Sequence, residues 1–102
     1  MAKDKYQIRL LRIAEEDFTE IVSYIENDNK SAANELVSVF ENNFELLSNN
    51  PLLGRIPRDE EIKKMGYRYL IVQNYLIFYS IEDKSILIHR IIHGARNYKD
   101  IL

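Results

Sequence analysis

The sequence predicts one α+β domain in which a helical hairpin packs on a four-stranded, mainly antiparallel sheet. Three observations lead to this class. Apolar residues recur at helical spacing in the first half of the chain, they alternate in the second half, and the later runs are separated by short turns. At 102 residues the chain suits a single domain over 1–102. The expected order is β-α-α-β-β-β, followed by a short C-terminal turn or helix.

The first strand and the first helix are distinguished by a change of period. Residues 6–11 alternate between apolar and polar side chains, which predicts a short strand at the edge of the sheet. From Ala14 to Ile25 the apolar spacing becomes three and four residues, and glutamates occupy the other side. This pattern predicts an amphipathic helix that ends near Asn27.

A second helix follows the polar stretch 27–31, in which Asn29 or Ser31 can cap the new helix. It ends before Pro51, because proline cannot continue the helical hydrogen bonds. Its single apolar stripe consists of Ala33, Leu36, Val37, Phe40, Phe44 and Leu47. Two antiparallel helices joined by a short turn are therefore expected.

The remaining chain is predicted to be a connection and three strands. Residues 51–66 are expected on the surface, with at most one helical turn in the charged stretch 58–64. The strands are runs rich in aromatic and β-branched residues, at 67–72, 75–81 and 86–92. The segments between these strands are so short that consecutive strands are expected to form hairpins.

Both faces of the last two predicted strands are apolar. In the middle strand Tyr75, Ile77, Tyr79 and Ile81 oppose Leu76 and Phe78, and in the last strand Ile86, Ile88 and Ile92 oppose Leu87 and Ile91. An antiparallel sheet with helices on one side normally has a polar second face. We therefore expect a partner protein to cover the second face; the alternative is that the 51–66 connection and the tail cover it.

Composition excludes several classes of protein. The chain has no cysteine, so it has no disulfide or thiolate metal site, and His89 and His93 alone leave little for zinc. We expect no metal and no cofactor. The longest apolar run, 69–81, is shorter than the ~20 residues of a membrane span, and residues 1–9 lack the pattern of a signal peptide, so neither feature is expected. A cytoplasmic protein without membrane contact is expected.

Charge is distributed unevenly along the chain. The net charge is −2, which gives no general attraction to nucleic acid. Residues 1–50 hold five Lys or Arg against ten Asp or Glu, whereas residues 51–102 hold nine against six. The second half can therefore carry a modest cationic surface.

Eight short motifs follow one another along the chain. They are Ala14-Glu-Glu-Asp17-Phe-Thr-Glu-Ile21, Tyr24-Ile25, Ala32-Ala33, Pro51-Leu-Leu-Gly54, Gly66-Tyr67-Arg68, Tyr75-Leu-Ile-Phe-Tyr79, Ile88-His-Arg-Ile-Ile and His93-Gly-Ala-Arg96. The set resembles the RelE/ParE superfamily of toxins from type II toxin–antitoxin modules. The resemblance implies a toxin whose groove and sheet are wrapped by a cognate antitoxin protein. It leaves open a homodimer or a heterotetramer with the antitoxin.

The superfamily resemblance implies one of two activities. RelE-like members are ribosome-dependent endoribonucleases that cut mRNA, and ParE-like members poison DNA gyrase. RNA cleavage requires a base, an acid and cations at the phosphate. On that alternative the catalytic candidates are His93 as acid or base, Arg96 and Arg68 as phosphate ligands, and Tyr98 as a stacking group. On the ParE-like alternative the target-binding candidates are Arg68, Tyr75, His93, Arg96 and Tyr98.

Departures from the RelE pattern favour the ParE-like activity, which would not be enzymatic. RelE-like nucleases typically carry an arginine after the tyrosine of the middle strand, but Leu76 follows Tyr75. Arg68 is the only cation on 67–72, and the whole chain is acidic. We therefore expect a growth-arresting gyrase poison. The alternatives are a ribosome-dependent mRNA endoribonuclease (mRNA interferase) and a non-toxic corepressor that only binds the antitoxin.

Overall fold

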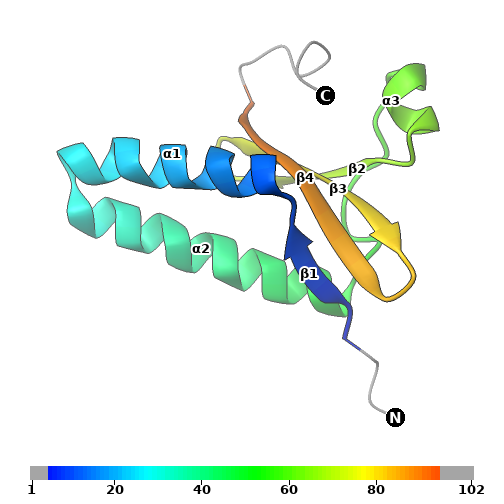
Figure 1. Ribbon diagram of the computed structural model, residues 1–102, viewed down its shortest axis with the longest axis horizontal. Coiled ribbons are helices and arrows are strands. Elements are labelled where there is room, and N and C mark those ends of the chain that lie inside the picture. The colour runs from blue at the N-terminus through cyan, green and yellow to red at the C-terminus, as the bar shows by residue number, and fades with distance from the viewer. Residues whose placement is uncertain (1–4, 95–102) are drawn as a thin grey trace.

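The computed structural model describes residues 5–94 and has the predicted order of elements, with one short helix added (Figure 1). The elements are β1 Gln7–Leu10, α1 Arg12–Asp28, α2 Lys30–Asn49, α3 Glu60–Lys64, β2 Arg68–Val72, β3 Tyr75–Glu82 and β4 Ser85–His93. The α+β class is confirmed, and α3 is the single helical turn expected in the charged stretch. The turn or helix predicted from Ala95 onward lies outside the described residues.

The four strands form one sheet in the order β1-β4-β3-β2. β1 runs parallel to β4, and the two hairpins β2–β3 and β3–β4 are antiparallel. Each hairpin turn contains a residue with positive φ, Gln73 at 54° and Asp83 at 52°, as tight turns between twisted strands require. β1 lies at the edge with Gln7 and Arg9 exposed, as its polar positions predict.

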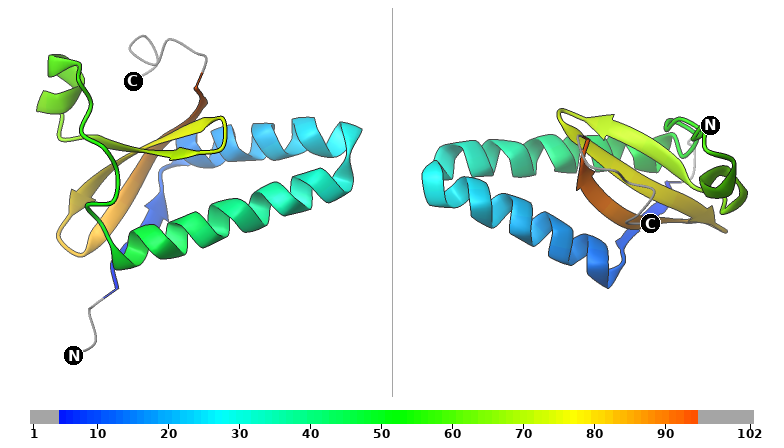
Figure 2. Two further views of the ribbon diagram at one scale, coloured as in Figure 1. Left: turned by 180° about the vertical axis from the view of Figure 1, so that it is seen from behind. Right: turned by 90° about the horizontal axis from the view of Figure 1, so that it is seen from above.

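The helical hairpin covers one face of the sheet (Figure 2). The turn between α1 and α2 is tighter than expected, because Asn29 is the single residue between the two helices. Its side chain accepts a hydrogen bond from the Ala32 amide at 3.0 Å, so Asn29, and not Ser31, caps α2.

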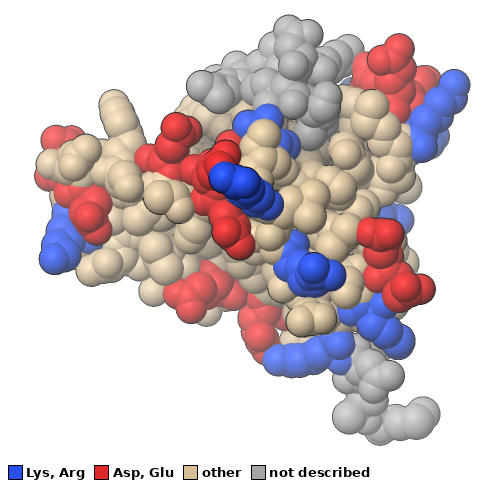
Figure 3. Space-filling view, viewed as in Figure 1, with Lys and Arg blue, Asp and Glu red and all other residues tan. Residues whose placement is uncertain are grey.

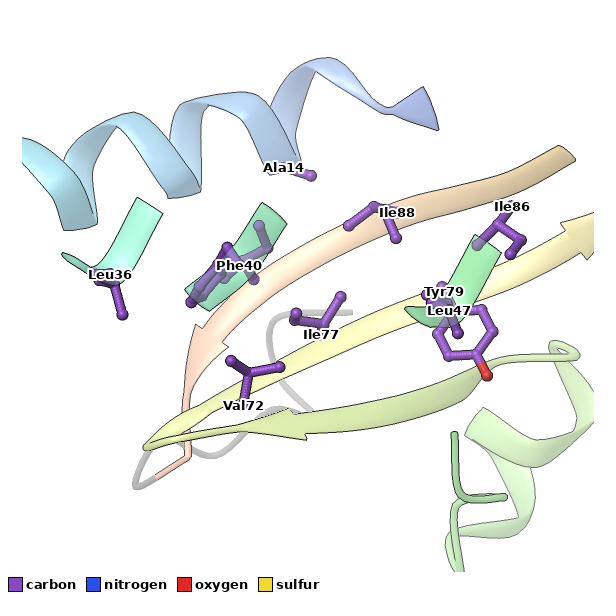
Figure 4. Close-up of a cluster of buried hydrophobic side chains, with 10 residues drawn as sticks. Ala14, Leu36, Phe40, Leu47, Val72, Ile77, Tyr79, Ile86 and Ile88 are labelled. Carbon is purple, nitrogen blue, oxygen red and sulfur yellow. The ribbon is translucent and has the colours of Figure 1, made fainter. Parts of the chain in front are cut away.

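The core lies between the hairpin and the sheet, with Phe40 near its centre (Figure 4). The Phe40 ring is fully buried, and its centroid lies 5.0 Å from that of Phe18 on α1 and 5.8 Å from that of Tyr75 on β3. The other fully or nearly buried members are Ala14, Leu36, Leu47, Val72, Ile77, Tyr79, Ile86, Ile88 and Ile91. The stripe predicted for α2 thus supplies Leu36, Phe40, Phe44 and Leu47 to this core, but Val39 takes the place expected for Val37.

A β-bulge in β4 places some side chains of the last strand on the opposite face from the one predicted. Tyr79 pairs with Ile88, but the preceding Phe78 pairs with Arg90, so His89 is an extra residue in β4. Beyond the bulge the alternation is inverted. Ile91, rather than Ile92, joins Ile88 on the helix side of the sheet. The sequence expectation failed here because unbroken alternation cannot anticipate an inserted residue.

The second face is less exposed than expected. Phe78 and Ile92 point to this face yet are only 1% and 2% exposed, whereas Ile71 is 47% exposed. Part of this face is therefore already buried within the chain, and an apolar area around Ile71 remains open for a partner.

The connection 51–66 is also not purely a surface segment. Gly54, Pro57 and Ile62 are buried, and Arg55 forms an antiparallel bridge with Tyr69 on the outer edge of β2. The connection is thus part of the packed structure and supplies an edge to the sheet.

Candidate functional site

The structure brings together two of the predicted site residues and separates a third. Tyr75 and His93 are cross-strand partners on β3 and β4, and their rings meet edge to face with centroids 5.7 Å apart. Arg68 pairs with Tyr79, four residues further along β3 than Tyr75, which corresponds to roughly 13 Å at about 3.3 Å per residue. Arg96 and Tyr98 lie outside the described residues.

Arg68 is engaged with the connection that precedes β2. Its Nη1 donates a hydrogen bond to the carbonyl oxygen of Gly54 at 3.1 Å, and the side chain is half-buried beside Tyr79. The structure thus gives Arg68 a structural contact at the opposite end of β2 from Tyr75 and His93.

His93 and Tyr75 lie at one end of a hollow between α1 and β4, which we call the α1–β4 groove. Its volume is about 670 Å³. It is lined by Asp17, Glu20, Ile21, Tyr24, Ile25, Tyr75, Ile91, Ile92 and His93. β1 pairs with β4 only as far as Ile88, so the groove follows the part of β4 that lies beyond the end of β1. Tyr24, 80% exposed, stands at its rim.

An ion pair between Asp17 and Arg90 holds α1 against this part of β4. The Asp17 carboxylate accepts hydrogen bonds from Arg90 Nε at 2.8 Å and Nη2 at 2.9 Å, and from the Ile91 amide at 3.0 Å. The two side chains are only 13% and 16% exposed. The hydrogen bonds to Asp17 raise the pKa of Arg90, which remains charged. Sequence reasoning gave Arg90 no role, since its partner is 73 residues away.

In the described part of the chain, the strands β2, β3 and β4 present no cluster of cations for a phosphate. Within residues 5–94, the strands β2, β3 and β4 carry two Lys or Arg residues, Arg68 and Arg90. Arg68 binds the Gly54 carbonyl and Arg90 binds Asp17. On the face shown in Figure 3, acidic side chains gather over the helical hairpin. The described groove is therefore better suited to protein contacts than to a polyanion.

His89 forms a polar cluster on the second face that the sequence did not identify. Ser80 Oγ lies 2.7 Å from His89 Nε2, and the imidazole centroid lies 4.5 Å from that of the Tyr67 ring. Burial lowers the pKa of His89, and the nearby Glu82 acts in the opposite direction. The neutral imidazole can accept a hydrogen bond from the Ser80 hydroxyl through Nε2. The signal that could have found this cluster is the bulge, which the sequence does not reveal.

Comparison with known proteins gives a consistent family and fold. The model of the family "ParE toxin of type II toxin-antitoxin system, parDE" matches residues 8–98. The chain is similar to a chain of the chromosomal ParDE system from P. aeruginosa, with a TM-score of 0.71, 19% identity and coverage of 89% of this chain and 98% of that chain. It is also similar to a chain of the toxin–antitoxin complex RelBE2 from Mycobacterium tuberculosis, with a TM-score of 0.63, 26% identity and coverage of 87% and 98%. The sequence has no significant match among curated proteins.

The described residues contain neither a candidate membrane span nor a candidate metal cluster. Over 5–94, no helix has the length and hydropathy that crossing a membrane requires. Nor does that part of the chain contain three or more His, Cys, Asp or Glu side chains grouped to hold a metal ion.

Proposed function

The chain belongs to the ParE toxin family of type II toxin–antitoxin systems, and from this membership we propose that it arrests bacterial growth by acting on DNA gyrase. A cognate antitoxin holds it inactive. The family match spans the helical hairpin, the α1–β4 groove and all but the first residue of the sheet.

One structural observation supports gyrase over RNA as the target. Both arginines of β2–β4 in the described part of the chain bind groups of the chain itself, Gly54 and Asp17. A ribosome-dependent nuclease must bind a polyanion and stabilise a developing charge on phosphate, which requires cations that face the substrate. The net charge of −2 points the same way.

The antitoxin is proposed as the partner at the α1–β4 groove. Both similar structures come from toxin–antitoxin systems. The groove combines apolar walls from Ile21 and Ile25 with an exposed aromatic side chain, Tyr24, which is the composition expected of a protein interface. Tyr75 and His93 lie at its end, so a bound antitoxin would also cover these two candidate target-binding residues.

The test of this function combines three measurements on the full chain. Purified toxin is expected to inhibit supercoiling by gyrase or to trap cleaved DNA, and addition of the antitoxin is expected to reverse the effect. Primer extension on translated messages is expected to show no codon-positioned cuts. Supercoiling that proceeds at its normal rate with excess toxin would contradict a gyrase target, and normal growth on expression without the antitoxin would favour the non-toxic corepressor.

Ribosome-dependent mRNA cleavage is the second candidate function. The similarity to a chain of the RelBE2 complex, at 26% identity, favours it. The exposed His93 beside Tyr75 supplies an acid or base next to an aromatic ring, two of the groups that such cleavage uses. Cuts in the ribosomal A site that disappear in a His93→Gln variant would establish this function instead.

A further inference from the structure

The pairing of β4 with β3 shifts by one residue immediately before Arg90. Up to the pair Tyr79–Ile88 the two strands match residue for residue. His89 is then the extra residue of the bulge, and pairing resumes with Arg90 opposite Phe78. We call this observed pairing the bulged register, and pairing that continued without the extra residue the regular register. The two registers differ by one place for every residue after the bulge.

In the regular register the guanidinium of Arg90 would lie in the core. Continued pairing would set Arg90 opposite Ile77, which is fully buried between the sheet and the helical hairpin. A charge in that position, away from water, is strongly unfavourable. The bulge instead turns Arg90 to the second face. Because β1 pairs with β4 only as far as Ile88, the guanidinium reaches Asp17 on α1 at the part of β4 that β1 does not cover.

The apolar residues of β4 do not decide between the two registers. Arg90 is followed by two isoleucines. In the bulged register Ile91 enters the core opposite Ile77, and in the regular register Ile92 would enter it opposite Tyr75. Register is usually set by the apolar pattern, but here either register supplies the core with an isoleucine. The charge of Arg90 and the carboxylate that receives it therefore distinguish the two.

Asp17 binds the bulged register through both a side chain and the backbone. Its carboxylate accepts hydrogen bonds from the Arg90 guanidinium and, at 3.0 Å, from the Ile91 amide. The Ile88 carbonyl faces β1, where it accepts from the Leu11 amide, so alternation in the regular register would turn the Ile91 amide away from Asp17 and toward β3. A slip to the regular register would thus break the backbone contact as well as the ion pair.

The register also decides whether the two candidate target-binding residues meet. In the bulged register His93 is opposite Tyr75, and their rings are in contact. In the regular register Ile92 would be opposite Tyr75, and His93 would move to the level of Asn74 in the hairpin turn. Bulges near functional sites commonly redirect a side chain in this manner.

From these contacts we infer that Asp17 and Arg90 are positioning residues of the toxin: together they select the bulged register of β4, and this register places His93 beside Tyr75 for contact with the target. The inference rests on the proposed function in one respect, namely that Tyr75 and His93 bind the target.

The test compares register and toxicity in the full chain. The double variant Asp17→Asn, Arg90→Leu leaves neither charge unpaired, and a leucine at position 90 restores unbroken alternation of apolar residues. Nuclear Overhauser contacts between the rings of Tyr75 and His93 are expected in the wild type and are expected to disappear in the double variant. Growth arrest by the double variant is expected to require at least tenfold higher expression.

Three further variants separate positioning from stability. Arg90→Lys keeps a positive charge beside Asp17 and is expected to retain the ring contact and growth arrest. Tyr79→Phe removes a buried hydroxyl that bonds to the connection, so it lowers the melting temperature and is expected to change neither readout. Asp17→Asn alone, which keeps an acceptor for the Ile91 amide, is the milder variant to use if the double variant does not fold, and a weaker ring contact and weaker arrest are expected.

Four outcomes would overturn the inference. A ring contact that persists in the folded double variant, or that is lost in Arg90→Lys, would show that the charge pair does not select the register. A lost contact with undiminished growth arrest would show that toxicity does not depend on the register. Equal loss of arrest in Tyr79→Phe would reduce the effect to stability. Growth arrest by a wild-type protein that does not inhibit gyrase would contradict only the proposed target, because ring contact and arrest could still be compared among the variants.

Discussion

At the scale of single residues, Tyr79 has the most consequential polar group in the core. Its ring is fully buried, and burial raises the pKa of the hydroxyl, so the group stays protonated and can donate to Pro51. Gly54 makes this arrangement possible, because a Cβ at that position would lie 2.6 Å from the tyrosine ring. The tyrosine and the glycine therefore depend on each other.

Tyr79→Phe tests the hydroxyl alone. The variant leaves the Gly54 amide without its acceptor in a buried position, which costs about 1–3 kcal/mol in the free energy of unfolding. Urea denaturation followed by circular dichroism measures this loss. Tyr24→Phe removes the hydroxyl of a tyrosine that is 80% exposed, and a change below about 0.5 kcal/mol is expected there. Equal stability of the two variants would refute the role of the Tyr79 hydroxyl.

His89 makes stability depend on pH in a defined direction. Its pKa in the folded chain is lowered by burial, so below about pH 6.5 the unfolded chain binds a proton more readily than the folded chain. Stability is therefore fully present above that pH and is lost as the pH falls through the lowered pKa. His89→Gln is expected to flatten the stability curve between about pH 7 and pH 5. The exposed His93→Gln serves as the control, and a wild-type curve that stays flat would contradict the prediction.

At the scale of elements, the Asp17–Arg90 pair joins α1 to the part of β4 that β1 does not reach. Because the two side chains are largely buried, Asp17→Ala leaves an uncompensated guanidinium and a backbone amide without an acceptor, and a loss of about 3–5 kcal/mol is expected. Chemical denaturation measures the loss, and hydrogen exchange at the Ile91 amide is expected to accelerate.

The neighbouring pair Arg12–Glu16 provides the control for this prediction. Its 3.5 Å contact joins side chains that are 93% and 63% exposed, so Glu16→Ala is expected to change stability by less than about 0.5 kcal/mol. A double variant lacking both Asp17 and Arg90 is expected to lose less than the sum of the single losses. Additive losses would mean that the two residues act independently.

Each element was predictable to the extent that its sequence period is unbroken. The stripes of α1 and α2 recur without interruption, so the hairpin could be derived from spacing alone. β4 could not, because the extra residue His89 inverts its faces without leaving a signal in the hydrophobic pattern. The Asp17–Arg90 and Arg68–Gly54 contacts could not be predicted from the sequence either, because each joins residues that are close only in the folded chain.

At the scale of the whole molecule, the hairpin and the sheet depend on one shared core. Phe40 contacts the ring of Phe18 on α1 and that of Tyr75 on β3, so it links all the layers. Phe40→Ala is expected to cost about 3–5 kcal/mol and to lower the melting temperature, as measured by calorimetry. Leu46→Ala, half-exposed on the same helix, is the control. If the two variants unfold at the same temperature, Phe40 is not the centre of the core.

The architecture as a whole was predictable only in part. The class and the order of elements follow from period and turn chemistry, but the parallel contact of β1 with β4 does not, because nothing local marks which strand an edge strand will join. The candidate site was likewise predictable only in part, because the positions of its residues depend on the register of the strands. Tyr75 and His93 meet because the hairpin register places them opposite each other, whereas Arg68 lies at the far end of its strand.

The parallel contact between the first and last strands also sets when the protein can finish folding. Gln7 pairs with Ser85, so β1 has no strand to join until nearly the whole chain has left the ribosome. At roughly 5–20 residues per second, β4 emerges several seconds after β1. During that interval the sheet of each nascent chain is incomplete. A protein that is already present in the cell therefore has time to bind the nascent toxin before the toxin has folded.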